Sequence, residues 1–258
     1  MRTSKSIVTV AVALAGFFLL VTIPDASAQE QDWEFTADIY LWYASMGGES
    51  ATGGDINIDA GDLIKNLDLG FMTVLGARKG KWSILSDIIY LNVSADNEST
   101  ITVPSVPGPS IQVKSEVELE GWIVTPVVGY NLMQSDTARL DILAGARYLW
   151  LASDLELNTL GPLQPRNRKI SDSGDVWDGI VGLKGELALG KNWSLPFYLD
   201  IGAGETNLTW QAIGGLSYKL KNSDLLLGYR YLAWDFDDND VFDDMNISGP
   251  YAGLELRF

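Results

Sequence analysis

Apolar and polar residues alternate with a period of two along most of the chain. Between Arg139 and Ala152, apolar side chains occupy the even-numbered positions, whereas Arg139, Asp141 and Arg147 fall on odd ones. Successive side chains of a β-strand point to opposite faces, so this pattern predicts strands with one apolar and one polar face. The ten predicted strands are 33–43, 69–78, 82–93, 113–132, 139–152, 176–189, 193–203, 209–220, 225–234 and 247–258.

The connections between these strands alternate between short and long. Short turns fall at 79–81, 133–137, 190–192 and 221–223, and most other connections are longer, with 204–208 as an exception. Short turns at one end and longer loops at the other are typical of outer-membrane barrels with both termini in the periplasm. We therefore predict an all-β fold, a ten-stranded antiparallel up-and-down transmembrane β-barrel, with eight strands as the alternative.

Aromatic residues bracket several of the outward faces. Eight to ten residues of a tilted strand span the apolar band of about 25 Å between the two aromatic girdles of such barrels. The alternative is a soluble periplasmic ligand-binding barrel, which would turn its apolar face inward. The bracketing pairs are Trp33 and Tyr43, Trp82 and Tyr90, and Trp210 and Tyr218.

The N-terminus has the pattern of a secretory signal peptide. Arg2 and Lys5 precede an apolar run from Ile7 to Ile23, and Ala26-Ser27-Ala28 supplies small residues for cleavage. We expect a signal peptide at 1–28 and one outer-membrane barrel domain at 29–258, with an uncleaved anchor as the alternative.

Composition narrows the possible functions. The chain has no cysteine and no histidine, which excludes disulfides, thiol chemistry and histidine-dependent catalysis. Cleavage at 28 leaves 16 basic and 33 acidic residues, a net charge of −17, which disfavours binding to nucleic acid. A hydrolase with paired carboxylates needs no histidine. Since nothing singles out one such pair, we predict that the protein is not an enzyme.

Charged residues gather on the faces predicted to point inward. Such groups must be paired or hydrated, so we expect a polar network that fills the lumen, with a charged solute pathway as the alternative. A Gly-x-Arg-Tyr-Leu repeat places Arg147 and Arg230 beside Gly145 and Gly228, where each arginine has room to meet a carboxylate such as Asp141 or Asp200. The predicted network comprises Glu34, Asp38, Arg78, Asp87, Asp141, Arg147, Asp178, Lys184, Asp200 and Arg230.

Two segments suggest ligands at the ends of strands. Asp235, Asp237 and Asn239 have the spacing of the first ligands of a calcium loop, but the turn glycine and the final glutamate of such a loop are missing. Calcium is therefore the one cofactor that the sequence suggests, and a solvated acidic loop is the alternative. The basic cluster 165–169 could contact lipopolysaccharide phosphates, with ordinary solvation as the alternative.

Asp62 is placed to cap a short helix in the loop that follows the first strand.

The chain ends in a motif that resembles the C-terminal assembly signal of Gram-negative outer-membrane barrels. Its residues are Tyr251, Gly253, Leu256 and Phe258. With Gly70-Phe71-Met72, Gly80-Lys81-Trp82, Trp177-Asp178-Gly179 and the second Gly-x-Arg-Tyr-Leu copy, the mature chain resembles uncharacterised proteobacterial outer-membrane β-barrel proteins. The resemblance implies insertion by the barrel assembly machinery among outer-membrane lipid and lipopolysaccharide, and it implies no substrate.

These observations predict an integral protein of the Gram-negative outer membrane. We expect either an envelope-structural barrel or a narrow, porin-like conduit for small solutes, because ten strands leave a lumen that side chains largely fill. The alternative is a barrel with a closed lumen that binds or adheres through its loops.

Overall fold

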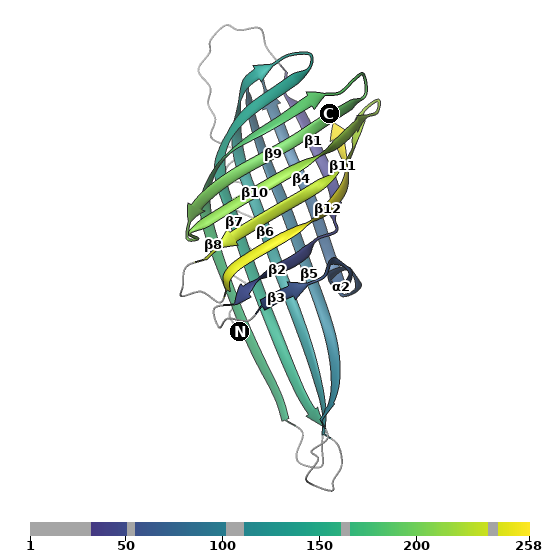
Figure 1. Cartoon of the computed structure of the whole chain (residues 1–258), viewed down its shortest axis with the longest axis vertical. Coiled ribbons are helices and arrows are strands. Elements are labelled where there is room, and N and C mark those ends of the chain that lie inside the picture. The colour runs from purple at the N-terminus through teal and green to yellow at the C-terminus, as the bar shows by residue number, and fades with distance from the viewer. Residues whose placement is uncertain (1–31, 51–54, 102–110, 161–165, 237–241) are drawn as a thin grey trace. The chain divides into compact units, whose positions relative to one another are not determined.

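The computed structural model describes residues 32–50, 55–101, 111–160, 166–236 and 242–258. Within these residues, ten antiparallel strands close into a barrel in the order β1 and β4 to β12, with β12 pairing back to β1 (Figure 1). The barrel strands are β1 (Glu34–Trp42), β4 (Leu67–Lys79), β5 (Trp82–Ile101), β6 (Ile111–Gln134), β7 (Ala138–Leu160), β8 (Arg166–Ala188), β9 (Trp193–Gly204), β10 (Leu208–Lys219), β11 (Ser223–Asp235) and β12 (Phe242–Arg257). The predicted fold and strand count are confirmed.

The two ends of the barrel differ. At one end, called the turn end, the short connections lie beside the start of β1 and the end of β12. Gly80 has a φ of +62° there, a left-handed conformation that favours glycine in the tight turn between β4 and β5. The opposite end, called the hairpin end, carries the remaining connections. The signal peptide stays a prediction, because residues 1–31 lie outside the described residues.

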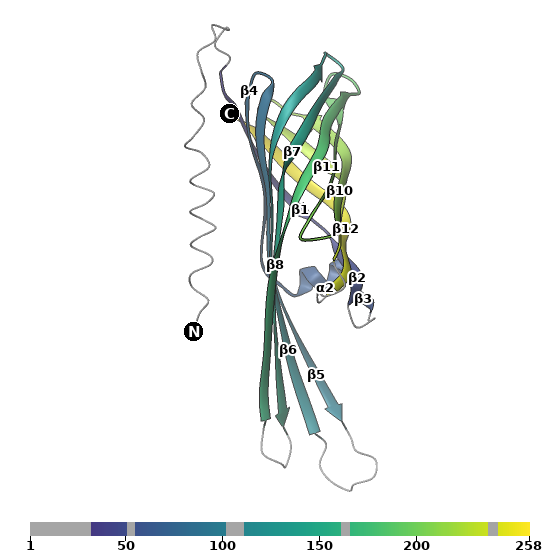
Figure 2. The ribbon, with the colours of Figure 1, turned by 90° about the vertical axis from the view of Figure 1, so that its left-hand side faces the viewer.

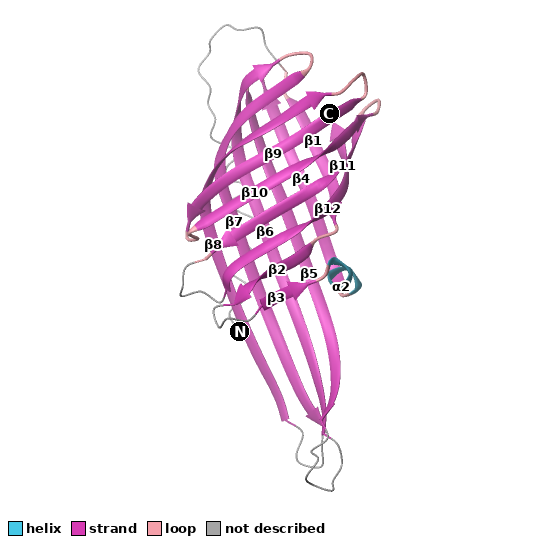
Figure 3. Cartoon of the chain, in the orientation of Figure 1, coloured by secondary structure: helices cyan, strands magenta, loops and turns pink. Residues whose placement is uncertain are grey.

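The segment between β1 and β4 is more ordered than the predicted loop. Strand β2 (Ser45–Ser50) continues the register of β1 along β12 and pairs with β3 (Asp55–Ile58). The helix α2 (Ala60–Lys65) then leads into β4, as Figure 3 shows. Its N-cap is Asp59, whose side chain makes no capping bond, and Asp62 lies inside the first turn, so the predicted cap was wrong.

Strands β5 to β8 continue past the hairpin end as a four-stranded sheet (Figure 2). The pairing of β8 with β9 begins at Asp178, whereas its pairing with β7 begins at Arg166. The segment of β8 between these two residues is roughly 40 Å long at about 3.3 Å per residue. The predicted strands 82–93 and 176–189 stop short here because residues 94–100 and 166–175 are mostly polar, and the strand predicted at 139–152 also ends early, whereas the one at 113–132 covers most of β6. We call this sheet, residues 94–101, 111–117, 153–160 and 166–175, the extension.

The outer face of the barrel is apolar and ringed by aromatic pairs. Neighbouring strands bring rings together at centroid distances of 4.6 to 5.0 Å. Trp82–Tyr130 and Trp193–Tyr218 lie near the turn end, whereas Tyr90–Trp122, Tyr148–Trp177 and Trp210–Tyr231 lie toward the hairpin end. Trp82 and Tyr90 are separated by roughly 20 Å along the axis at usual strand rise and tilt. Exposed leucines and isoleucines fill the band between these girdles, which fits the apolar interior of a membrane.

Among the described residues, no helix has the length and apolarity needed to span a membrane.

Candidate functional site

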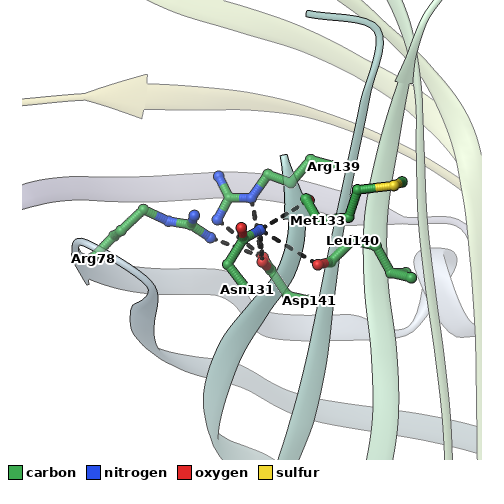
Figure 4. A network of polar contacts seen from close by, with 6 residues as sticks. All are labelled: Arg78, Asn131, Met133, Arg139, Leu140 and Asp141. Atoms are coloured by element: carbon green, nitrogen blue, oxygen red, sulfur yellow. Dashed lines mark hydrogen bonds and ion pairs between the residues drawn. The ribbon is translucent and has the colours of Figure 1, made fainter. Parts of the chain in front are cut away.

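The barrel interior holds polar side chains in successive levels from the turn end upward. At the lowest level, Asp141 of β7 receives two guanidinium groups. Arg78 Nη2 lies 2.8 Å and Arg139 Nη2 2.9 Å from Asp141 Oδ2, and Asn131 Nδ2 donates to Oδ1 at 2.7 Å (Figure 4). Arg257 forms ion pairs with Asp224 and Glu255 at the same end.

A second level spans the lumen near its middle and centres on Arg230. Its Nη2 lies 2.7 Å from Asp87 Oδ2 and donates to Gln211 Oε1 at 2.6 Å, while Nη1 donates to the Tyr40 hydroxyl at 2.8 Å. Tyr40 in turn donates to Asp87 Oδ1 at 2.6 Å. The guanidinium also lies over the Trp42 ring, 4.7 Å from its centroid. These contacts join β1, β5, β10 and β11 across the barrel.

Arg147 forms a separate buried group in the upper part of the lumen. Its side chain is fully buried, with Nη2 2.5 Å from Asp200 Oδ2 and Nη1 donating to Thr209 Oγ1 at 2.8 Å. Both charges are removed from water, so the pair depends on its geometry to offset the cost of desolvation. Asp178 lies nearby in β8, where its Oδ1 accepts the Thr206 N–H at 3.0 Å and holds the β9–β10 turn.

From the Arg230 level toward the hairpin end, the lumen is packed with apolar side chains. Trp234 is 2% exposed and Leu232 is fully buried, and they pack with inward residues of most strands. We call this cluster the plug, and its buried members are Tyr40, Trp42, Ala44, Met72, Ile89, Ile123, Leu149, Leu232, Trp234, Phe236, Met245 and Ile247. Buried apolar side chains in mutual contact pack closely in proteins, which disfavours a continuous column of water.

Below the plug the lumen is hollow. A cavity of about 630 Å³ opens at the turn end, lined by residues that include Arg78, Arg139 and Glu186. A narrower cavity of about 150 Å³ adjoins it, since both are lined by Lys184 and Glu255, and it ends at the Arg230 level. The two cavities therefore lie between the turn end and the plug.

The remaining predicted network residues take varied positions. Glu34 is exposed at the rim of the turn end, beside Arg78 in the register of β1 and β4. Asp38 and Lys184 are half-buried and face the narrower cavity. Arg230 pairs with Asp87 rather than with the suggested Asp141 or Asp200. The glycines beside the arginines serve other contacts: a Cβ on Gly228 would lie 2.6 Å from the Tyr251 ring.

The residues of the predicted C-terminal assembly signal lie in the last part of the β12 ladder and just after it. Tyr251 points into the lumen and meets Tyr40 edge-on at 6.4 Å, Gly253 pairs with Tyr40 in the ladder, Leu256 is half-buried, and Phe258 is exposed at the turn end. Their role as an assembly signal stays a prediction.

The calcium hypothesis gains no support from the described part of the chain. Asp235 is the exposed last residue of β11, and Asp237 and Asn239 lie outside the described residues. No cluster of acidic residues suited to a metal occurs in the described ranges. The basic cluster begins β8 in the extension, where Lys169 Nζ lies 3.2 Å from Asp154 Oδ2.

Sequence reasoning from charge missed the uncharged members of the interior. Gln211, Thr209 and Asn131 complete the arginine and aspartate groups, and Trp42 and Trp234 belong to the plug. The alternation itself contained a signal for Trp42, because this residue shares the inward face of β1 with Asp38.

No protein-family model matches the chain, and no curated protein matches it. The translocator domain of the autotransporter NalP from Neisseria meningitidis is 15% identical, with 100% of both chains covered and a TM-score of 0.45. Ail, the attachment invasion locus protein of Yersinia pestis, is 12% identical over 89% of this chain and 100% of that one, with a TM-score of 0.31. The toluene transporter TodX of Pseudomonas putida is 12% identical over 90% of each chain, with a TM-score of 0.31. Similarity of this degree carries no inference about function.

Proposed function

We propose that the protein is an integral barrel of the Gram-negative outer membrane whose lumen is closed to solutes and which acts through its extension at the cell surface. The plug is the observation that carries this proposal. A conduit needs a continuous polar path, whereas here the apolar residues Trp42, Leu232 and Trp234 fill the lumen above two levels of buried ion pairs.

The placement in the outer membrane rests on the surface of the barrel. An apolar band between two aromatic girdles, short turns beside both ends of the barrel domain and longer hairpins opposite favour a periplasmic turn end and an extracellular hairpin end. Outer-membrane lipid and lipopolysaccharide are then the surroundings, and the barrel assembly machinery is the expected insertion route.

The extension is the part that reaches beyond the membrane. Four paired strands project from one side of the barrel mouth, with β5 and β8 as edges that have no further strand partner among the described residues. Paired strands hold a surface in place far better than a mobile loop does, which suits binding or adhesion. The proposal assigns no catalysis, in keeping with the absence of histidine.

Conductance in a planar bilayer tests the closed lumen. We expect the refolded mature protein, shown to be folded by its heat-modifiable gel shift, to give no channel openings. The variant Trp42→Ala removes a plug side chain and should produce openings, whereas Tyr43→Ala, its neighbour on the lipid face, should stay silent. Discrete openings by the unmodified protein would refute the proposal.

Surface labelling tests the orientation and the extension. An epitope inserted between residues 161 and 165 should be accessible to antibody on intact cells, whereas an epitope at 190–192 should become accessible only after the outer membrane is permeabilised. A variant with shortened β5–β6 and β7–β8 hairpins should keep its gel shift yet lose the adhesion of cells that make the full-length protein. Equal adhesion by both would remove the extension from the proposal.

A further inference from the structure

The two cavities below the plug together form a pocket with a single mouth. The wide outer part opens at the turn end, and the narrow inner part lies between the Asp141 level and the Arg230 level. A concave, partly apolar pocket with a few convergent polar groups is the usual form of a small-molecule site. Neither the plug nor the extension requires such a pocket.

Apolar side chains line most of the inner part. Val74, Val127 and Ile213 come from three separate strands, and the rings of Tyr198 and Tyr251 contribute further lining. The volume of about 150 Å³ equals that of an apolar protein cavity known to accept a benzene-sized molecule. The inner part therefore has space for one compact apolar group.

Two charged side chains of the inner part have no ion-pair partner in the described chain. Asp38 on β1 and Lys184 on β8 come from opposite walls, since five strand steps separate β1 from β8 in either direction around the barrel. No ion pair joins them, and Asp38 Oδ1 is shielded from solvent without a hydrogen bond. Buried polar groups in proteins are normally satisfied, so this one calls for an explanation.

The other charges around the inner part are already compensated. Asp87 accepts from Tyr40 and pairs with Arg230, and Glu255 pairs with Arg257. This leaves one carboxylate and one ammonium facing the same small volume from opposite sides. A ligand that carries both a cation and an anion matches this arrangement, whereas a ligand with one charge leaves the other group unpaired.

We propose that this pocket binds a small zwitterion of the amino-acid type from the periplasmic side. Its ammonium group pairs with Asp38, its carboxylate pairs with Lys184, and its apolar side group occupies the space beside Val74, Val127 and Ile213. The plug prevents onward passage, so the site serves binding and not transport.

Calorimetric titration of the refolded mature protein in detergent with L-phenylalanine tests this site. Phenylethylamine, which lacks the carboxylate, and phenylpropionate, which lacks the ammonium, serve as matched probes. We expect L-phenylalanine to bind with a Kd of about 1 mM or below and each probe to bind about tenfold more weakly. Absence of heat with L-phenylalanine up to about 10 mM would overturn the proposal.

Variants then assign the two charges. Asp38→Asn should weaken the binding of L-phenylalanine and phenylethylamine by about tenfold and leave that of phenylpropionate unchanged. Lys184→Gln should weaken the binding of L-phenylalanine and phenylpropionate by about tenfold and leave that of phenylethylamine unchanged. Binding that ignores both substitutions would overturn the site even if the amino acid binds. Leu226→Trp fills the pocket and should abolish binding, whereas Leu227→Trp, on the lipid face of the same strand, should not. The gel shift shows that each variant has folded, and a conducting lumen would be detected separately in the bilayer.

Discussion

Replacement of Arg147 by methionine should destabilise the barrel strongly. The arginine is 0% exposed and its partner Asp200 is 6% exposed, so Arg147→Met leaves a carboxylate in the lumen with its cation removed. Loss of one member of a buried ion pair costs about 3 to 5 kcal/mol, because the remaining charge stays desolvated. Thr209 also loses its hydrogen bond from Nη1, which adds about 1 kcal/mol.

The free energy of unfolding in urea, measured for the mature chain in lipid vesicles by tryptophan fluorescence, provides the assay. The double variant Arg147→Met with Asp200→Leu should recover most of the loss, since an apolar pair often replaces a buried ion pair without penalty. Arg139→Met is the matched control. Its side chain is 30% exposed and Asp141 keeps Arg78 and Asn131, so the change should stay below about 1 kcal/mol.

Two results would refute this reasoning. A loss below about 1 kcal/mol for Arg147→Met would mean that water reaches Asp200 and solvates it. A double variant as unstable as the single one would mean that the loss reflects the shape of the side chain and not the unpaired charge.

Three further changes probe other parts of the barrel. Gly228→Ala brings its new carbon within 2.5 Å of a neighbouring backbone oxygen and should cost about 1 to 3 kcal/mol in urea unfolding, whereas Gly214→Ala meets nothing within 4 Å and should be neutral. Leu227→Arg places a charge on the lipid face, which should cost about 2 to 4 kcal/mol in vesicles; an unchanged stability would argue that this face meets water. Outside the membrane band, the hydrogen bond from Ser171 and the neighbouring Lys169 ammonium lower the pKa of Asp154 from its ordinary 3.8. A lowered pKa stabilises the folded form above 3.8, and this effect is lost as the pH falls through the folded pKa, so hydrogen exchange in the β7–β8 extension should rise as the pH falls below 3.8, before the barrel opens.

The strands were predictable because their signal is local. Alternation of side chains in β1, β7 and β11 separates the lipid face from the lumen without any knowledge of neighbours. The same signal failed for β2, whose glycines and polar residues carry no apolar face, and for β3, whose alternation is limited to Ile56 and Ile58 in a four-residue strand. The parts of the extension in β5 and β8 were missed because residues 94–100 and 166–175 are mostly polar and carry no regular alternation.

The sequence by itself determined the ten strands and the alternation of short turns with longer connections. Only the tertiary structure decided that Arg147 meets Asp200, that Arg230 meets Asp87 and that the buried apolar side chains gather in the plug. Arg147 and Asp200 come from strands two steps apart around the ring, and Arg230 and Asp87 from strands four steps apart, so each contact depends on the stagger and tilt set by closure. A pattern along one strand specifies which way a side chain points, whereas its partner across the lumen is specified by the whole ring.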